Sequence, residues 1–181
     1  MSEPPNSDVV VEAHDLTKDY VATVGLEALN LTVERGEVLG FLGPNGAGKS
    51  TAIRCLLDLI RPTRGWAKIF GCHPSDPVSR LRIGYLPGEL TLDERFSRQQ
   101  MLDFLGKLRS DGKPVDRKRQ GELCERLRLP QVDLVRVLRD DSRGTKQKIG
   151  LVSAFQHDPD LLILDDRPRP TRARGLLRVT A

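Results

Sequence analysis

The sequence predicts an α/β fold with an inserted helical segment, and three observations support this prediction. Continuous apolar runs at residues 38–42 and 161–164 are typical of strands that are buried on both faces of a sheet. The first run leads through a glycine-rich stretch into a helical pattern that we expect to span residues 49–60. From residue 89 to 141 the strand patterns vanish, the charge density rises and apolar residues recur at helical spacing.

The remaining elements follow in chain order. Short apolar stretches predict further strands that begin at residue 9 and lie around residues 26–33, 66–70 and 82–86. Pro62 and Gly65 end the first helix, and a last helix is expected at residues 146–156. Within the insert, two helical stripes predict the packing residues Met101, Phe104, Leu105, Leu108, Leu123, Cys124 and Leu127.

Composition narrows the functional class. Of the 181 residues, 38% are hydrophobic and 30% charged, a balance typical of a soluble globular domain. No apolar run approaches the roughly 18 residues that a membrane span needs. The N-terminus has neither the basic start nor the apolar stretch of a secretory signal. The three cysteines and three histidines show no metal-ligand spacing, so a reduced, cytoplasmic location is expected.

The charge is concentrated in the tail. Residues 167–181 hold five arginines and no acidic residue, so leaving them out lowers the formal net charge from +4 to −1. A body close to neutral does not offer the basic face that nucleic acid requires. We therefore expect no nucleic-acid partner.

A phosphate-binding loop is predicted after the first buried strand. Residues 43–50 match the pattern G-x-x-x-x-G-K-[ST], with a strand pattern before them and a helical pattern after them. Glycines let backbone N–H groups approach phosphate oxygens, Lys49 adds a full positive charge, and the hydroxyl of Ser50 is suited to ligate Mg²⁺. The alternative is a glycine-rich turn with an incidental lysine. The expected nucleotide-binding residues are Gly43, Pro44, Asn45, Gly46, Ala47, Gly48, Lys49, Ser50 and Thr51.

A second motif pairs with this loop. The apolar run at 161–164 ends in Asp165, and we expect this strand to lie beside the strand of the phosphate loop and deliver Asp165 to the metal. Asp166 stands where a general base for the attacking water would be, although Asp is one methylene shorter than Glu. The alternative for both residues is a solvated turn at the end of a strand.

Four segments resemble, in their order and spacing, those of the ATP-binding subunits of ABC transporters. The segments are FLGPNGAGKST at 41–51, IGYLPGE at 83–89, SRGTKQ at 142–147 and HDPDLLILD at 157–165. In that family they correspond to Walker A, the Q-loop region, a variant signature motif and the lead into Walker B. The resemblance covers residues 9–166 and implies ATP and Mg²⁺ as ligands.

The resemblance also implies an organisation and further site residues. The chain would be a single ABC ATPase domain: a P-loop NTPase core at 9–88 and 142–166, with a helical subdomain at 89–141 inserted before the signature motif. Tyr20 would stack on adenine, and Ser142 and Gly144 would contact the γ-phosphate of ATP bound to the opposite subunit. Lys49 and Asp166 would be the catalytic residues, with Ser50 and Asp165 as metal ligands. The implied partners are transmembrane permease subunits and a second ATP-binding subunit, at the inner face of the cell membrane.

The chain departs from the family pattern at several positions. Gly88 or Glu89 stands in place of the Q-loop glutamine, and Arg143 replaces the first signature glycine. After Asp166 we find no D-loop and expect no later strand, and all three histidines precede Asp165, so none can be the switch histidine. We therefore expect residues 167–181 to be an irregular Arg/Pro-rich tail and the C-terminal part of the core to be missing. The tail resembles translation in a shifted reading frame, which is one hypothesis beside a natural truncation and an artificially shortened chain.

Two functions fit these observations. The first is the ATP-binding subunit of an ABC exporter, which binds Mg-ATP and couples its hydrolysis to transport across a membrane. The alternative is a non-catalytic nucleotide-binding remnant that lacks the D-loop and the switch histidine. Because the groups that complete the reaction are absent or short, we expect turnover by this chain to be impaired. A soluble ABC-type ATPase acting on ribosomes or DNA fits less well, since such chains usually carry a second ATPase domain or a nucleic-acid arm.

Overall fold

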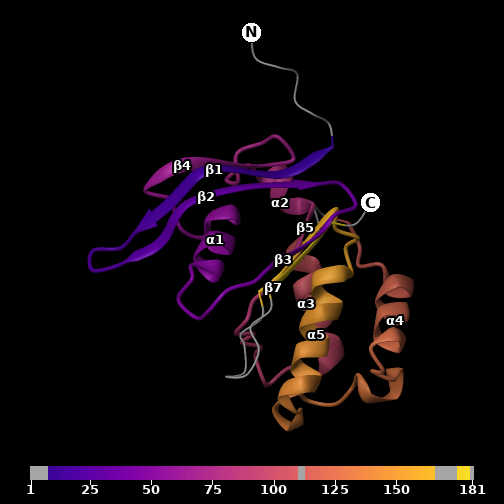
Figure 1. The fold of residues 1–181 in the computed structure, drawn as a ribbon. Helices are drawn as coiled ribbons and strands as arrows, with labels where there is room; N and C mark the ends of the chain where they lie inside the picture. The colour runs from indigo at the N-terminus through magenta and orange to yellow at the C-terminus, as the bar shows by residue number, and fades with distance from the viewer. Residues whose placement is uncertain (1–7, 110–112, 166–174, 180–181) are drawn as a thin grey trace. The chain divides into compact units, whose positions relative to one another are not determined.

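The computed structural model describes residues 8–109, 113–165 and 175–179 (Figure 1). The described residues form two compact units. The first unit contains the chain up to Ile83 and the residues from Asp160 onward, and the second is Gly84–Pro159. Among the described residues, no helix combines the length and apolar character that crossing a bilayer requires.

The first unit contains a three-stranded antiparallel sheet with the order β2-β1-β4. Its strands are β1 (Val9–Asp19), β2 (Val24–Glu34) and β4 (Arg64–Ile69). Val11 in the central strand faces Val33 on one side and Ile69 on the other, and all three side chains are fully buried. Helix α1 (Lys49–Leu56) packs against β2 and β4, so this sheet covers the helix that follows the phosphate loop (Figure 1).

The second sheet carries the strands that lead into the predicted motifs. Its order is β3-β7-β6-β5, with β3 (Val38–Phe41), β7 (Gly175–Val179), β6 (Leu161–Leu164) and β5 (Ile83–Leu86). β7 runs antiparallel to both of its neighbours, and Leu177 is paired with Leu39 of β3 and with Ile163 of β6. In Figure 1 β7 lies directly alongside β3.

This arrangement corrects two expectations. The expectation that no strand follows Asp166 is wrong for residues 175–179, which form β7. The expectation that the strand of Asp165 lies beside the strand of the phosphate loop is also wrong, because β7 lies between them. Arginine and proline dominate the start of the tail, but Gly175–Val179 contains two leucines and a valine, which are residues typical of strands. The backbone of this segment pairs with the hydrogen-bonding groups of both β3 and β6. Residues 167–174 of the expected tail lie outside the described residues.

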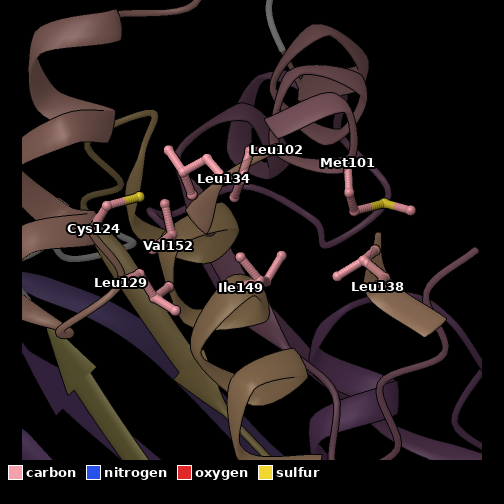
Figure 2. Packing of buried hydrophobic residues seen from close by; sticks show 8 residues of the cluster. All are labelled: Met101, Leu102, Cys124, Leu129, Leu134, Leu138, Ile149 and Val152. Atoms are coloured by element: carbon pink, nitrogen blue, oxygen red, sulfur yellow. The ribbon is translucent and has the colours of Figure 1, made fainter. Parts of the chain in front are cut away.

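The second unit is helical, as the sequence predicts for this part of the chain. Its helices are α3 (Arg98–Arg109), α4 (Arg117–Arg126) and α5 (Arg143–Phe155), with single 3-10 turns η1 (Gln131–Asp133) and η2 (Leu138–Asp140). Figure 2 shows the side chains that meet at its centre, which come from all three helices and from the turns between α4 and α5. They are Met101, Leu102, Cys124, Leu129, Leu134, Leu138, Ile149 and Val152.

The predicted stripes are confirmed only in part. Met101 and Cys124 are buried in this core, and Leu105, Leu123 and Leu127 pack against it. Phe104 and Leu108 remain 46% and 66% exposed, so the predicted stripe on α3 is wider than the face that the unit buries.

Helix boundaries also differ from the expected ones. α1 ends at Leu56 rather than residue 60, and Asp58 has a positive φ of 53°, which a continuing helix does not allow. α5 begins at Arg143, three residues earlier than expected, because Ser142 caps it. The helix α2 (Pro77–Leu81) was not predicted. Asp76 caps it by accepting a hydrogen bond from the backbone N–H of Val78 at 2.9 Å.

Candidate functional site

The phosphate loop joins β3 to α1 in the first unit. Gly46 and Gly48 have φ values of 86° and 81°, in the left-handed region that favours glycine. A Cβ on Gly48 would lie 2.6 Å from the carbonyl oxygen of Gly25 in β2, so no larger residue fits there without a shift of the backbone. The local fold thus explains why the motif has glycine at its last position before Lys49.

The N-terminus of α1 is open to an anion. Gly48 is the N-cap residue and has no side chain to cap the helix, so the first N–H groups of α1 keep their hydrogen-bonding capacity for a ligand. The Nζ of Lys49 donates to the carbonyl oxygens of Gly43 and Pro44, each at 2.7 Å. The positive charge of Lys49 is therefore held at the loop where phosphate oxygens are expected to bind.

Ser50 and Asp165 meet although 115 residues separate them. The hydroxyl of Ser50 donates to Oδ1 of Asp165 at 3.1 Å. Ser50 lies in the first turn of α1, and Asp165 directly follows β6. Two side-chain oxygens, one of them a carboxylate, suit Mg²⁺, which in phosphate-transfer sites completes its octahedron with water and phosphate oxygens. Within the described ranges, no cluster of three or more His, Cys, Asp or Glu side chains that could hold a metal occurs.

Tyr20 is the first residue of the turn that joins β1 to β2. Its backbone exchanges two hydrogen bonds with Thr23, at 2.8 and 3.2 Å, and its side chain is 44% exposed. The ring lies against Gly25, since a Cβ on Gly25 would come within 2.3 Å of Cε2 of Tyr20. The Nζ of Lys18 is 5.5 Å from the ring centroid.

Gly25 is a site residue that the sequence analysis missed. It touches the ring of Tyr20, and its carbonyl oxygen is the group that a side chain on Gly48 would strike. A glycine inside a strand pattern is the signal that could have revealed it, because such a glycine often marks a close approach. Gly25 therefore lies between Tyr20 on one side and Gly48 of the phosphate loop on the other.

The other predicted site residues lie elsewhere. Ser142 and Gly144 are exposed and belong to the second unit, where Ser142 caps α5 by accepting a hydrogen bond from the N–H of Thr145 at 3.2 Å. Asp166, the predicted general base, lies outside the described residues.

Cys55 on α1 is buried, and burial raises the pKa of its thiol although Lys18 acts in the opposite direction, which indicates a packing role.

Comparison with known proteins assigns this geometry to a family. The family described as "ABC transporter" matches residues 26–168. The chain is 33% identical over 161 residues to the bacitracin transport ATP-binding protein BcrA of Enterococcus faecalis, covering 88% of this chain and 51% of that protein. It is 34% identical to the daunorubicin resistance ATP-binding protein DrrA3 of Streptomyces coeruleorubidus, covering 96% of this chain and 55% of that protein.

The solved structures agree. An ATP-binding subunit of an ABC transporter superposes with a TM-score of 0.75 at 31% identity, covering 86% of this chain and 65% of that one. The chain spans about half the length of the curated relatives it matches, 49% and 51% in two cases. The α/β fold with a P-loop and a helical unit before Asp165 agrees with these relatives. On these grounds, the chain belongs to the ABC transporter family, among its ATP-binding proteins.

Proposed function

We propose that this chain binds Mg-ATP in its first unit as the ATP-binding subunit of an ABC exporter. The observation that carries the proposal is the 3.1 Å hydrogen bond between Ser50 and Asp165, formed next to a phosphate loop with the two glycine conformations it needs. A hydroxyl and a carboxylate brought together next to a phosphate loop are the side chains that hold Mg²⁺ with a bound triphosphate in P-loop sites.

The residues have distinct roles in this proposal. Lys49 leaves the carbonyl oxygens of Gly43 and Pro44 and pairs with phosphate oxygens, while the first N–H groups of α1 bind the same anion. Ser50 and Asp165 would hold Mg²⁺, which would supply positive charge to neutralise the phosphates. Tyr20 stacks on adenine from the hairpin at the edge of the β2-β1-β4 sheet.

The partners and the transport role are proposed from the family. Relatives named for bacitracin transport and for daunorubicin resistance support an exporter of small molecules. We propose that the chain pairs with a second ATP-binding subunit through Ser142 and Gly144. It attaches to transmembrane subunits at the inner face of the membrane through its helical unit, near residues 89–141.

Hydrolysis requires a group that orients the attacking water. Asp166 is the proposed water-orienting base, and its side chain is one methylene shorter than that of a glutamate. A non-catalytic nucleotide-binding protein is therefore the second candidate. In that case the chain binds Mg-ATP as described but turns it over slowly.

One experiment separates these possibilities. Titration of ATP into the full chain with Mg²⁺ is expected to show binding that Lys49→Ala weakens by at least about tenfold, because one charged contact to phosphate is lost. Equal affinity of the two proteins would contradict the proposed site. Phosphate release by the same samples then decides between the candidates: turnover of about 1 s⁻¹ or more that Lys49→Ala abolishes supports the ATPase, and background turnover supports the non-catalytic protein.

A further inference from the structure

In the second unit, the start of α3 lies beside the segment that leads into α5. The backbone N–H of Leu138 donates to the carbonyl of Phe96 at 3.0 Å, and the N–H of Arg98 donates to the carbonyl of Arg136 at the same distance. Ser97 and Val137 form an isolated antiparallel bridge between these hydrogen bonds. Two stretches of chain 40 residues apart are thus joined like a short piece of sheet.

A buried ion pair extends this junction. The Nε of Arg98 donates to Oδ2 of Asp141 at 2.8 Å, and its Nη2 donates to Oδ1 of the same carboxylate. The side chains are only 7% and 4% exposed, so the two-bond fork is withdrawn from solvent. Asp133 lies farther away, at 3.9 Å from Nη1, and is more exposed. The hydrogen bond that Arg98 donates to Asp141 raises the pKa of the Arg98 guanidinium despite the opposing effect of burial, so this guanidinium stays charged.

Buried ion pairs in general contribute little net stability. Removing two charges from water costs free energy that their attraction does not reliably return, and apolar replacements of buried pairs are often neutral or stabilising. A planar fork, in contrast, fixes distance and orientation at once. The pair is therefore suited to hold one piece of backbone in a defined position.

The piece of backbone that it holds is the start of α5. Asp141 directly precedes Ser142, the N-cap residue, and its own N–H donates to the carbonyl of Leu138 at 3.1 Å. A second tie runs from the first turn of α5 to the same junction, where the Nζ of Lys146 is hydrogen-bonded to Glu94. The cap is therefore fixed on both sides, through Asp141 before it and Lys146 after it.

We propose that Arg98 and Asp141 are positioning residues that orient Ser142 and Gly144 toward the nucleotide of a second copy. This inference rests on the proposed function, in which Ser142 and Gly144 meet a γ-phosphate bound to the opposite subunit. The ion pair touches neither nucleotide nor metal. It acts through the backbone of Asp141, which sets where the hydroxyl of Ser142 and the first N–H groups of α5 point.

The test replaces the ion pair without leaving a charge buried alone. In the full chain, Arg98→Met combined with Asp141→Leu removes both charges, and Arg98→Lys keeps the charge but loses the fork. The matched control is Arg117→Met with Asp103→Leu, which removes another ion pair of the same unit, between α4 and α3. Three quantities are measured: the midpoint of denaturant unfolding, hydrogen exchange of individual amides, and self-association with Mg-ATP.

The positioning role predicts a specific pattern. The apolar double variant unfolds at a denaturant concentration equal to or above that of the unchanged chain. Its Thr145 and Lys146 amides exchange at least about tenfold faster, while the Gln120 amide of α4 is unaffected. Its ATP-dependent self-association weakens by about tenfold or more, because small misplacements are costly at such a contact. The amide exchange and the self-association of Arg98→Lys are intermediate between those of the unchanged chain and the apolar double variant. The control double variant self-associates like the unchanged chain.

Two outcomes would overturn the inference. One is unchanged exchange at Thr145 and Lys146 in the apolar variant, which would show that packing alone places the cap. The other is faster exchange with undiminished self-association, which would show that the position does not matter for pairing. If the unchanged chain binds ATP but does not self-associate, the proposed pairing is wrong, and the amide exchange alone decides whether Arg98 and Asp141 position the cap.

Discussion

At the scale of single residues, glycines determine much of the backbone geometry of the candidate site. Gly48 must be glycine because its φ is 81° and because the carbonyl of Gly25 occupies the space of a side chain. The motif pattern predicts Gly48, since the loop cannot form without it. Gly25 escaped prediction because its role depends on Tyr20 and Gly48, which the hairpin and the sheet bring to it only in the folded chain.

A prediction about Gly25 follows from its contact with Tyr20. In Gly25→Ala the new methyl group displaces the ring of Tyr20, which can turn outward because the side chain is half-exposed. We expect ATP affinity to fall by about fivefold or more, as in Tyr20→Ala, because base stacking is worth roughly 1–3 kcal/mol. Affinity for inorganic tripolyphosphate should change little. The measurement is a competition titration with both ligands.

The variant that combines Gly25→Ala with Tyr20→Ala provides the control. If Gly25 acts through the ring, adding Gly25→Ala to Tyr20→Ala causes no further loss of ATP affinity. Additive losses, or equal losses for tripolyphosphate, would show that the substitution disturbs the phosphate loop instead.

At the scale of elements, periodicity predicts helices well and their exact extent less well. The start of α5 lies at Ser142, whose capping hydrogen bond extends the helix beyond its apolar pattern. On α3, Phe104 and Leu108 continue the apolar stripe but remain exposed, since α5, which packs against α3, covers only part of that face. Periodicity reports which side chains could be buried, whereas burial depends on what packs against them.

The ion pair between α3 and α4 gives a prediction about pH. Burial acts to raise the pKa of Asp103, but hydrogen bonds from Arg117 and Gln99 outweigh it, and the pKa is lowered. A carboxylate with a lowered pKa in the folded state contributes stability above its unfolded pKa of about 3.9. That contribution to stability is lost as the pH falls through the lower pKa that Asp103 has in the folded state.

We therefore expect Asp103→Asn to lower the free energy of unfolding by about 1 kcal/mol at pH 7 and by progressively less below about pH 4. Urea unfolding across this pH range measures the difference. Glu122→Gln, which removes an exposed carboxylate of α4, serves as the control. A difference between Asp103→Asn and the unchanged chain that stays constant down to pH 2 would rule out the ion pair as its source.

At the scale of the whole molecule, the sequence predicts the family fold but not the strand between its two motifs. The apolar runs of β3 and β6 are visible in the sequence, whereas β7 follows an Arg/Pro-rich stretch that resembles coil. Its pairing depends on β3 and β6 offering their backbone groups from both sides, which no local pattern records. Nevertheless, the hydroxyl of Ser50 and the carboxylate of Asp165 are hydrogen-bonded as the predicted metal site requires, although β7 separates β3 from β6.

A substitution in β7 tests this arrangement. Leu177→Pro removes a backbone donor in a strand paired on both sides, which is expected to cost about 3 kcal/mol or more of stability and to weaken Mg-ATP binding at Ser50 and Asp165. Leu177→Val keeps the donor and is expected to behave like the unchanged chain. Denaturant unfolding and ATP titration of both variants provide the comparison. Equal behaviour of the two variants would show that β7 does not hold β3 and β6 in place.

The most direct test of the account is the contribution of Mg²⁺ to ATP affinity. ATP is titrated into the unchanged chain, Ser50→Ala, Asp165→Asn and the double variant, each with Mg²⁺ and with chelator. We expect Mg²⁺ to tighten ATP binding in the unchanged chain, each single substitution to remove most of this gain, and the double variant to lose little more, because both oxygens serve one metal. A gain from Mg²⁺ that persists in Asp165→Asn, or no gain in the unchanged chain, would contradict the claim that Ser50 and Asp165 form the metal site of an ATP-binding subunit.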